Sequence, residues 1–518
     1  MSGMLTLKID GKCDGQCTCT GSSNIPNLKA KKVTDIGGVT NFTKYTHSVP
    51  GGGTFTLSGQ LSNGGKIGSG NNMEYVQSIA VYFWNGNPSD PILLGIKRTG
   101  DNGNITTSYY GKNNPGSNDW NVPLDGMDEL QALDDQNCKH NNVIPLNIEG
   151  SQSISLPKES NSECIQNRRI MSTRSPDSPP GSDYTVKAQK ITDIDGRDSN
   201  GTKISRVTYN GNPVEITLPK GYEVSKIRIF SYPGGTGASV PLMFELKSTG
   251  GGNSTFYTTK NQKGTSWTEA DNGNSFYGKG NPTPLPALAE RLDKVLCSQG
   301  YVTLNLSFKN SEEHQRGGAY CCDEHNKKKV TVNKDSVKSS QGITFYKHDV
   351  DYESKVAGIY YTVGGERKRI RIPNLENSGD GSVKFYTFYS NNGSKEPRLI
   401  YLDSTGQPNA KGWFQPSNSP SNDTWEPFQD IPKEITPENI GKDKTGDSNS
   451  KKHVEELKCI IYGICTLHPH NPLLSNLDLI NLLDIKVELV PVLLLLLAKL
   501  TFKNLIEMDL MVEDLLKD

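Results

Sequence analysis

A strand-rich pattern that occurs three times constrains the fold of this 518-residue chain more than any other feature. Each copy runs through several short β-type segments to a loop with a tryptophan, and then to a cysteine. The copies are anchored near their starts by Thr46, Thr208 and Thr362, and at their ends by Cys138, Cys297 and Cys459. Corresponding anchors lie about 160 residues apart, a spacing that indicates tandem copies of one folding unit.

The segments inside each copy alternate apolar and polar residues. In VQSIAVYFW, Ile79, Val81 and Phe83 fall on one face at period two, and clusters of Gly, Pro and Asn bound the segments. Such runs are typical of β-strands, and many short strands favour a sandwich. The sequence therefore predicts an all-β protein with three tandem β-sandwich modules of the immunoglobulin-like (Ig-like) type, short helices and a helical C-terminal tail.

Changes in composition set the expected domain boundaries. The stretch SPDSPPGSD shows no hydrophobic periodicity and indicates a linker. In the third copy a charged segment takes the place of the helix, which predicts a less regular end. The expected order is a Cys-rich N-terminal segment (1–30), module one (31–154), a linker (155–188), module two (189–308), a second linker (309–329), module three (330–463) and a Leu-rich helical tail (464–518).

The tail differs in composition from the rest of the chain, because no glycine follows Gly463 and leucine dominates. Its longest uncharged apolar run, Leu489 to Ala498, is shorter than the roughly 20 residues that a membrane-spanning helix needs. Three interpretations stay open: a helix that binds a partner or a bilayer surface, an incorrectly assigned end of the gene, and a true membrane anchor.

Ten cysteines are too few for a disulfide-dense scaffold and gather in linkers, termini and module ends. Metal sites are the alternative for KCDGQCTCTG and for the adjacent pair in the second linker, which His314 and His325 flank, but neither has the spacing of a zinc site. We therefore expect no metal. The candidate disulfide cysteines are Cys13, Cys17, Cys19, Cys138, Cys164, Cys297, Cys321, Cys322 and Cys459.

Tryptophans recur in the polar loops of all three copies. They are candidate loop contacts, either as an exposed aromatic platform for a glycan or protein or as plugs over the end of a core, and their recurrence in every copy favours the plug. The basic run from Arg367 to Arg371 predicts the solvated face of a strand, with a ligand-binding patch as the alternative. The candidate tryptophans are Trp120, Trp267, Trp413 and Trp425.

A search for catalytic chemistry finds no centre. The chain has no G-x-S-x-G, H-E-x-x-H or G-x-x-x-x-G-K-[ST] motif, and no histidine recurs in all three copies. The carboxylate pair Asp134 and Asp135 is expected to be solvated. A net charge of −1 argues against nucleic acid as a partner. The sequence predicts neither an enzyme nor a cofactor.

Several stretches resemble piroplasm (Theileria-type) proteins of expanded gene families: MSGMLTLKID-GKCDGQCTC, Y-T-H-S, VYFW with PILL, the YYG…W loop and LDDQNC…NNVIPLNI. The similarity is greatest to the tandem-module family of the equine Theileria parasite, with a fainter likeness to FAINT-domain proteins. It covers about residues 1–463, most convincingly 1–150. The resemblance implies a lineage-specific protein, compatible with a host-facing role, and supplies no catalytic residue.

We therefore expect a non-enzymatic surface-display or host-interaction protein that binds an unknown protein or glycan. The alternative is an intracellular scaffold that assembles through its Leu-rich tail, and a glycan hydrolase would need two carboxylates facing one cleft. The resemblance favours secretion or the cell surface, although the start shows no signal-peptide pattern. Seven N-x-[ST] glycosylation sequons add little weight to the expectation of secretion: Asn41, Asn104, Asn200, Asn253, Asn305, Asn392 and Asn422.

Overall fold

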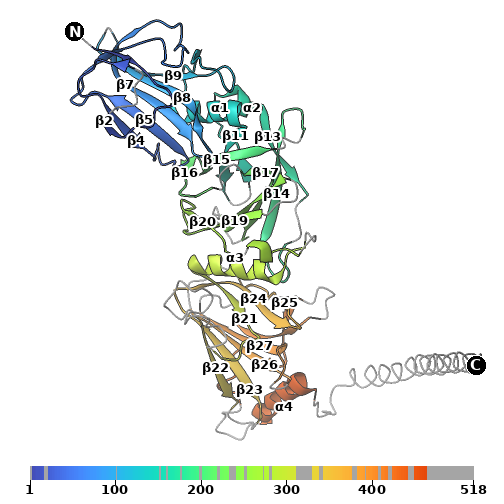
Figure 1. The fold of residues 1–518 in the computed structure, drawn as a ribbon. Coiled ribbons are helices and arrows are strands. Elements are labelled where there is room, and N and C mark those ends of the chain that lie inside the picture. Colours follow the sequence, from blue (N-terminus) through green and yellow to red (C-terminus); the bar gives the residue numbers. More distant parts are fainter. Residues whose placement is uncertain are drawn as a thin grey trace, which may run out of the picture.

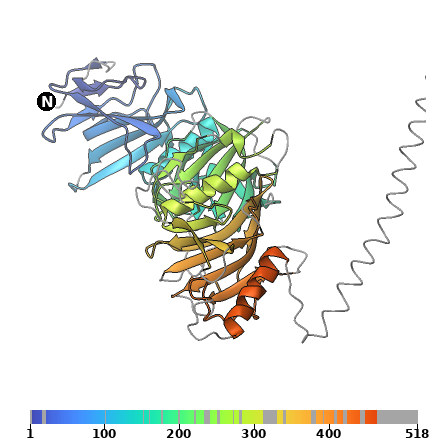
Figure 2. The same ribbon diagram turned by 90° about the horizontal axis from the view of Figure 1, so that it is seen from below.

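The computed structural model describes residues 3–16, 22–100, 102–150, 153–158, 161–174, 178–197, 201–218, 222–232, 241–249, 254–271, 273–278, 283–310, 330–337, 342–375, 382–390, 393–405, 410–417, 423–440 and 448–463. These residues are predominantly β and form several sheets, as the alternating segments predict (Figure 1). We divide them into unit one (3–141), unit two (143–298) and unit three (301–463). The units follow one another from the N-terminal end to the last helix, as the turned view in Figure 2 also shows.

Unit one has a long sheet and a short one that meet at β6 and β7. The long sheet runs in the order β10-β9-β8-β7-β5-β4-β2, while β1 pairs with β3 and β6. Its elements are β1 (Met4–Thr6), β2 (Gly15–Gln16), β3 (Ser22–Ser23), β4 (Lys29–Val33), β5 (Phe42–Ser48), β6 (Phe55–Leu57), β7 (Met73–Trp84), β8 (Asn87–Thr99), β9 (Ile105–Gly111), β10 (Val122–Pro123) and α1 (Glu129–Asn141). The segment 1–30 thus contributes strands to this unit.

Unit two follows the same plan. Strands β13, β14, β17, β18, β19 and β20 pair in that order, and β17 also pairs with β15, beside β11 and β16. Its elements are β11 (Val143–Glu149), β12 (Ser153–Ser155), α2 (Glu163–Gln166), β13 (Arg168–Thr173), β14 (Thr185–Asp193), β15 (Thr202–Tyr209), β16 (Asn212–Pro213), β17 (Glu223–Ser231), β18 (Met243–Ser248), β19 (Ser254–Thr259), β20 (Trp267–Glu269), the 3₁₀ turn η2 (Gly273–Ser275) and α3 (Pro286–Ser298).

In unit three the two sets of strands form two sheets, which an isolated bridge between Arg371 and Thr424 connects. One sheet has the order β22-β23-β26-β27-β28-β29 and the other β21-β24-β25. Its elements are β21 (Tyr301–Asn305), β22 (Val330–Ser336), β23 (Thr344–Val350), β24 (Lys355–Val363), β25 (Glu366–Ile370), β26 (Val383–Tyr389), β27 (Pro397–Ser404), β28 (Gly412–Pro416), β29 (Trp425–Pro427) and α4 (Ser448–Tyr462). We call the longer set in each unit the main sheet and the shorter set the minor sheet.

The first strand of each minor sheet crosses the predicted boundaries. Strand β11, expected to close module one, pairs in parallel with β15 of unit two, and β21 pairs in parallel with β24 of unit three. The N-terminal β1 pairs in parallel with β6 in the same way. Units two and three therefore each begin with the strand that follows the previous helix.

Three other expectations need correction. The segment 155–188, expected to be a linker, holds α2, β13 and the start of β14. Strand β13 lies at a sheet edge with no buried residue, so it shows little hydrophobic alternation. The charged segment before Cys459 contains α4, which buries Val454, Leu457 and Ile461 among its charges. The Leu-rich tail (464–518) lies outside the described residues.

The sequence anchors were also misaligned by one strand. Thr46 lies on β5, which pairs with the central strand β7, whereas Thr208 and Thr362 lie on β15 and β24 of the minor sheets. The structural counterparts of β5 are β14 and β23, which pair with β17 and β26. Because these strands alternate alike in sequence, only their pairing partners distinguish them.

Each main sheet has buried residues on both faces. In unit two, Ile227 and Leu246 join the minor-sheet residue Ile204 in one buried cluster, while Phe230 and Met243 join α3 residues in another. Helices α1 and α4 cover the main sheets of units one and three in the same way. Among the described residues, no helix combines the length and the apolar character needed to cross a membrane.

Candidate functional site

Helix α1 lies between units one and two and is buried on every side over nearly two turns. Residues 132–138 are all buried, among them four polar side chains in a row. Asp128 starts the helix through a capping box with Gln131, and Asn142 ends it with φ of 53°. The expectation that Asp134 and Asp135 are solvated is wrong, because the next unit covers the helix face that they occupy.

Asp134 pairs with an arginine of unit two across this junction. Nε and Nη2 of Arg206 lie 2.9 and 2.7 Å from Oδ2 of Asp134, and the Ser205 hydroxyl donates to Oδ1 at 3.3 Å. Burial raises the pKa of the Asp134 carboxyl, and Arg206 and Ser205 offset part of that shift. Asn41 of unit one donates to the Ser205 carbonyl at 2.5 Å, so the contact joins both units.

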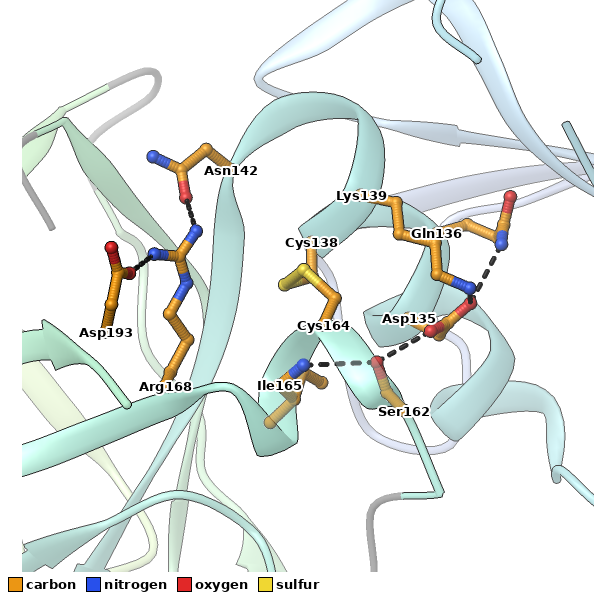
Figure 3. Close-up of a disulfide and its surroundings, with 10 residues drawn as sticks. All are labelled: Asp135, Gln136, Cys138, Lys139, Asn142, Ser162, Cys164, Ile165, Arg168 and Asp193. Carbon is orange, nitrogen blue, oxygen red and sulfur yellow. Dashed lines mark hydrogen bonds and ion pairs between the residues drawn. A yellow bond between two sulfur atoms is a disulfide. The ribbon is translucent and has the colours of Figure 1, made fainter. Parts of the chain in front are cut away.

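Asp135 binds a second group of partners beside a disulfide (Figure 3). Its carboxylate lies 2.9 Å from Nζ of Lys139 and accepts the Ser162 hydroxyl at 2.6 Å. Ser162 also caps α2, which carries Cys164, and Cys164 is bonded to Cys138 of α1. The disulfide and the carboxylate therefore hold α2 of unit two against α1.

A pocket of about 690 Å³ opens at the same junction. Three of its lining residues bind one another, because Asn147 accepts hydrogen bonds from the Thr208 hydroxyl at 2.8 Å and from the Gly211 backbone amide at 2.9 Å. The pocket is lined by Asp128, Leu130, Gln131, Asp134, Pro145, Asn147, Glu149, Pro157, Lys158, Arg206, Thr208, Asn210, Gly211, Asn212 and Pro213. Its lining combines amides, carboxylates and two cations with Leu130 and three prolines.

The carboxylates of the pocket have structural partners. Asp128 accepts the Gln131 amide at 2.8 Å, Asp134 is held by Arg206, and Glu149 accepts the Ser155 hydroxyl at 2.7 Å. A general acid or base needs an oxygen directed at the substrate instead. One oxygen of Asp128 and one of Glu149 are thus bound within the protein, as are both oxygens of Asp134.

The second junction repeats the pairing of a helix carboxylate with an arginine. Asp293 of α3 accepts hydrogen bonds from Nη1 of Arg367 at 2.5 Å and from the Tyr184 hydroxyl at 2.6 Å. The Arg367 guanidinium also lies 3.6 Å from the ring centre of Tyr360. Burial opposes the charge of Arg367, but Asp293 and Tyr360 outweigh it and raise the pKa of the guanidinium.

The basic run of β25 is therefore an interface rather than a solvated face. Arg367, Arg369 and Arg371 fall on one side of the strand at period two. Arg369 and Arg371 both form ion pairs with Asp183 of unit two. Lys368 points the other way and pairs with the exposed Glu366. The acidic partners come from a distant part of the chain, so the sequence pattern alone could not show them.

One regularity in the sequence marks these junction residues. Asp134 and Asp293 each stand four residues before the helix cysteine of their copy. Glu455 takes the same position before Cys459 in α4, where no further unit follows among the described residues and Glu455 pairs with Lys458 of the same helix. Arg206 and the pocket have no comparable signal in the sequence, whereas Asn147 recurs as Asn305, and the two bond Thr208 and Thr362.

The candidate tryptophans are not an exposed platform. Trp120, Trp267 and Trp425 lie in the clusters between main and minor sheets, whereas Trp413 lies in the cluster under α4. All four are at most 3 % exposed, which agrees with the alternative that they plug a core. The indole nitrogens of Trp267 and Trp413 donate to the carbonyls of Gly264 and Ile435.

The candidate cysteines fall into two groups. Cys138 and Cys164 are bonded to each other, and Cys13, Cys297 and Cys459 are also disulfide-bonded. Cys17, Cys19, Cys321 and Cys322 lie outside the described residues, as do His314 and His325. Within the described part of the chain, no group of three His, Cys, Asp or Glu side chains is placed to hold a metal ion.

Comparison with known proteins adds no relative. No protein-family model matches the sequence, and neither a curated protein nor a solved structure matches it at a significant level. The functional argument therefore rests on the site itself.

Proposed function

We propose that this chain is a non-enzymatic binding protein of the cell surface or another oxidising compartment, built of three Ig-like β-sandwich modules. The observation that carries the proposal is the direct joining of the units, since β11 and β21 follow at once on the helix of one unit and enter the sheet of the next. Such a chain presents its loops and faces at fixed positions relative to one another.

The buried contacts at the junctions support this rigidity. Domains joined by small polar interfaces usually move relative to one another. Here a buried ion pair crosses each junction, Asp134 with Arg206 and Asp293 with Arg367. Removing one partner of such a pair leaves a buried charge uncompensated, which is costly. Rigid presentation favours binding because less conformational entropy is lost when a partner binds.

The cysteines favour an oxidising location. The helix cysteine of every copy is disulfide-bonded. Disulfides persist in secreted and cell-surface proteins and are rare where thiols are kept reduced. The scaffold alternative depends on residues 464–518, outside the described part, so no observation on the junctions favours it.

A binding assay with the full chain tests the proposal. The protein is secreted from eukaryotic cells with its disulfides formed, labelled, and applied to equine cells, the host that the resemblance implies. We expect saturable binding that unlabelled protein displaces. Absence of saturable binding by folded, oxidised protein would refute the proposal. Self-association that is lost on deletion of 464–518 would then support the scaffold.

A further inference from the structure

The main sheets carry a row of residues on the face that the helices cover only in part. In unit two, Ile227 and Leu246 point into the core between the sheets, so their neighbours Lys226 and Lys247 point to the opposite face. Phe230 and Met243 on that same face are covered by α3. Lys226 and Lys247 are only half-buried, which places them on the open part of the sheet.

The two lysines lie directly opposite each other on adjacent strands. Lys226 pairs in register with Lys247, and Lys247 with Ser254 of β19. Gln189 is the last residue of β14 that pairs in register with β17, and Lys190 is the next residue along β14. Lys190 itself pairs in register with Met171 of β13. The row Met171, Lys190, Lys226, Lys247 and Ser254 therefore crosses five strands, with neighbouring strands about 4.8 Å apart.

Placing like charges directly opposite each other destabilises a sheet. Burial, Arg228 and Lys247 lower the pKa of Lys226, while Glu245 offsets part of that shift. Glu245 is itself bound to Arg228 at 2.9 Å and accepts the Ser254 hydroxyl. Lys226 and Lys247 thus bring two positive charges together on this face, which an incoming anion would neutralise.

The corresponding row of unit three is built differently. Lys384 stands before the core residue Phe385, as Lys226 stands before Ile227, but it lies in register between Asp349 and Asp403. Its charge is therefore compensated within the sheet. In unit one the row has Lys29, Ser48, Ser78, Lys97 and Thr107, which is basic and rich in hydroxyl groups.

We propose that the lysine row of unit two binds a sulfated linear polysaccharide. This inference rests on the proposed binding function and names its partner class. Sulfate groups accept charge-assisted hydrogen bonds from ammonium groups, which Lys226 and Lys247 supply. A protein partner needs buried aromatic or arginine anchors, whereas this row offers a single exposed apolar side chain, Met171.

Heparin is the probe, applied to the full oxidised chain. The test variant is K226S/K247S, since Ser78 occupies the position of Lys226 in unit one. The matched control is K384S/K411S, which removes the same charge from unit three, where Lys411 is paired with Asp403. Circular dichroism and thermal unfolding verify that both variants fold. We expect the test variant to bind heparin about tenfold more weakly, and the control to bind like the native protein.

Three results would overturn the inference. Equal weakening in both variants would mean that heparin senses only net charge. Unchanged binding of K226S/K247S would remove the row as the site. Competition by polyglutamate as effective as that by heparin would point to an acidic polypeptide instead. If cells still bind the protein while K226S/K247S retains heparin affinity, the polysaccharide inference fails and the proposed binding function stands.

Discussion

Arg367 of β25 forms a bidentate ion pair with the carboxylate of Asp293 in α3, with Nη1 2.5 Å from Oδ2 and Nη2 3.3 Å from Oδ1. Both side chains are nearly buried, and 74 residues of chain separate them. The pair joins unit two to unit three as Asp134 and Arg206 join unit one to unit two. The same helix position is thus used twice, while the arginine comes from β25 in one junction and from β15 in the other.

Substituting Asp293→Asn should destabilise the protein strongly. The change leaves the Arg367 guanidinium buried without a counter-charge, a loss of about 3–5 kcal/mol for pairs of this kind. Urea unfolding followed by circular dichroism measures it. The control is Glu366→Gln, which removes the exposed partner of Lys368 on the same strand and should cause no measurable change. Equal effects of the two substitutions would contradict a buried junction pair.

His348 should make stability fall as the solution becomes acidic. Burial lowers its pKa to about 3, below the value near 6.5 of an unfolded chain. The unfolded state therefore takes up a proton first, so the contribution is complete above pH 6.5 and is lost as pH falls toward 3. Between pH 7 and pH 5 this group alone should cost about 2 kcal/mol.

The variant His348→Gln isolates that contribution, because Gln189 stands at the corresponding position of unit two. Unfolding free energies at pH 7 and pH 5 should differ less in the variant than in the native protein. Identical pH dependence of the two proteins would show that His348 titrates normally in the folded state.

Loss of the bond between Cys138 and Cys164 should loosen the first junction. This disulfide closes a loop between two cysteines that are 26 residues apart in the sequence. Loop-closure entropy predicts a cost of about 3 kcal/mol for the double variant C138S/C164S. Thermal unfolding gives the cost, and a non-reducing peptide map of the native protein must contain the linked peptides. Free thiols at both positions would argue against the oxidising location.

All five tryptophans should behave as buried groups in fluorescence measurements. Trp84, Trp120, Trp267, Trp413 and Trp425 are at most 5 % exposed. Native fluorescence should be blue-shifted and resist quenching by iodide, and both properties should be lost in urea. The substitution Trp267→Ala should cost about 3–5 kcal/mol. Strong quenching of the folded protein would restore the exposed platform that the sequence also allowed.

Glycosylation in a secretory host should discriminate between the described sequons. Asn104 is exposed after the β8 strand, whereas Asn305 is 6 % exposed in β21 and the Asn41 amide is bound to the Ser205 carbonyl. Mass spectrometry should find a glycan at Asn104 and none at Asn305. Occupancy of Asn305 would contradict the insertion of β21 into unit three.

The central strands were predictable because their signal is local. Ile79, Val81 and Phe83 alternate within one segment, and the same alternation indicates β17 and β26. Such periodicity identifies a strand but not the strand beside it. The misaligned anchor at Thr46 and the undetected edge strand β13 both follow from this limit.

The sequence by itself determined a repeated β-rich chain with a cysteine at the end of each copy, because composition, period and spacing are properties of neighbouring residues. Only the tertiary structure decided that β11 and β21 belong to the following units, that Asp134 and Arg367 are buried, and that the tryptophans fill cores. Those features depend on contacts between residues far apart in the chain. Burial turned an apparently solvated carboxylate into the connection between two units.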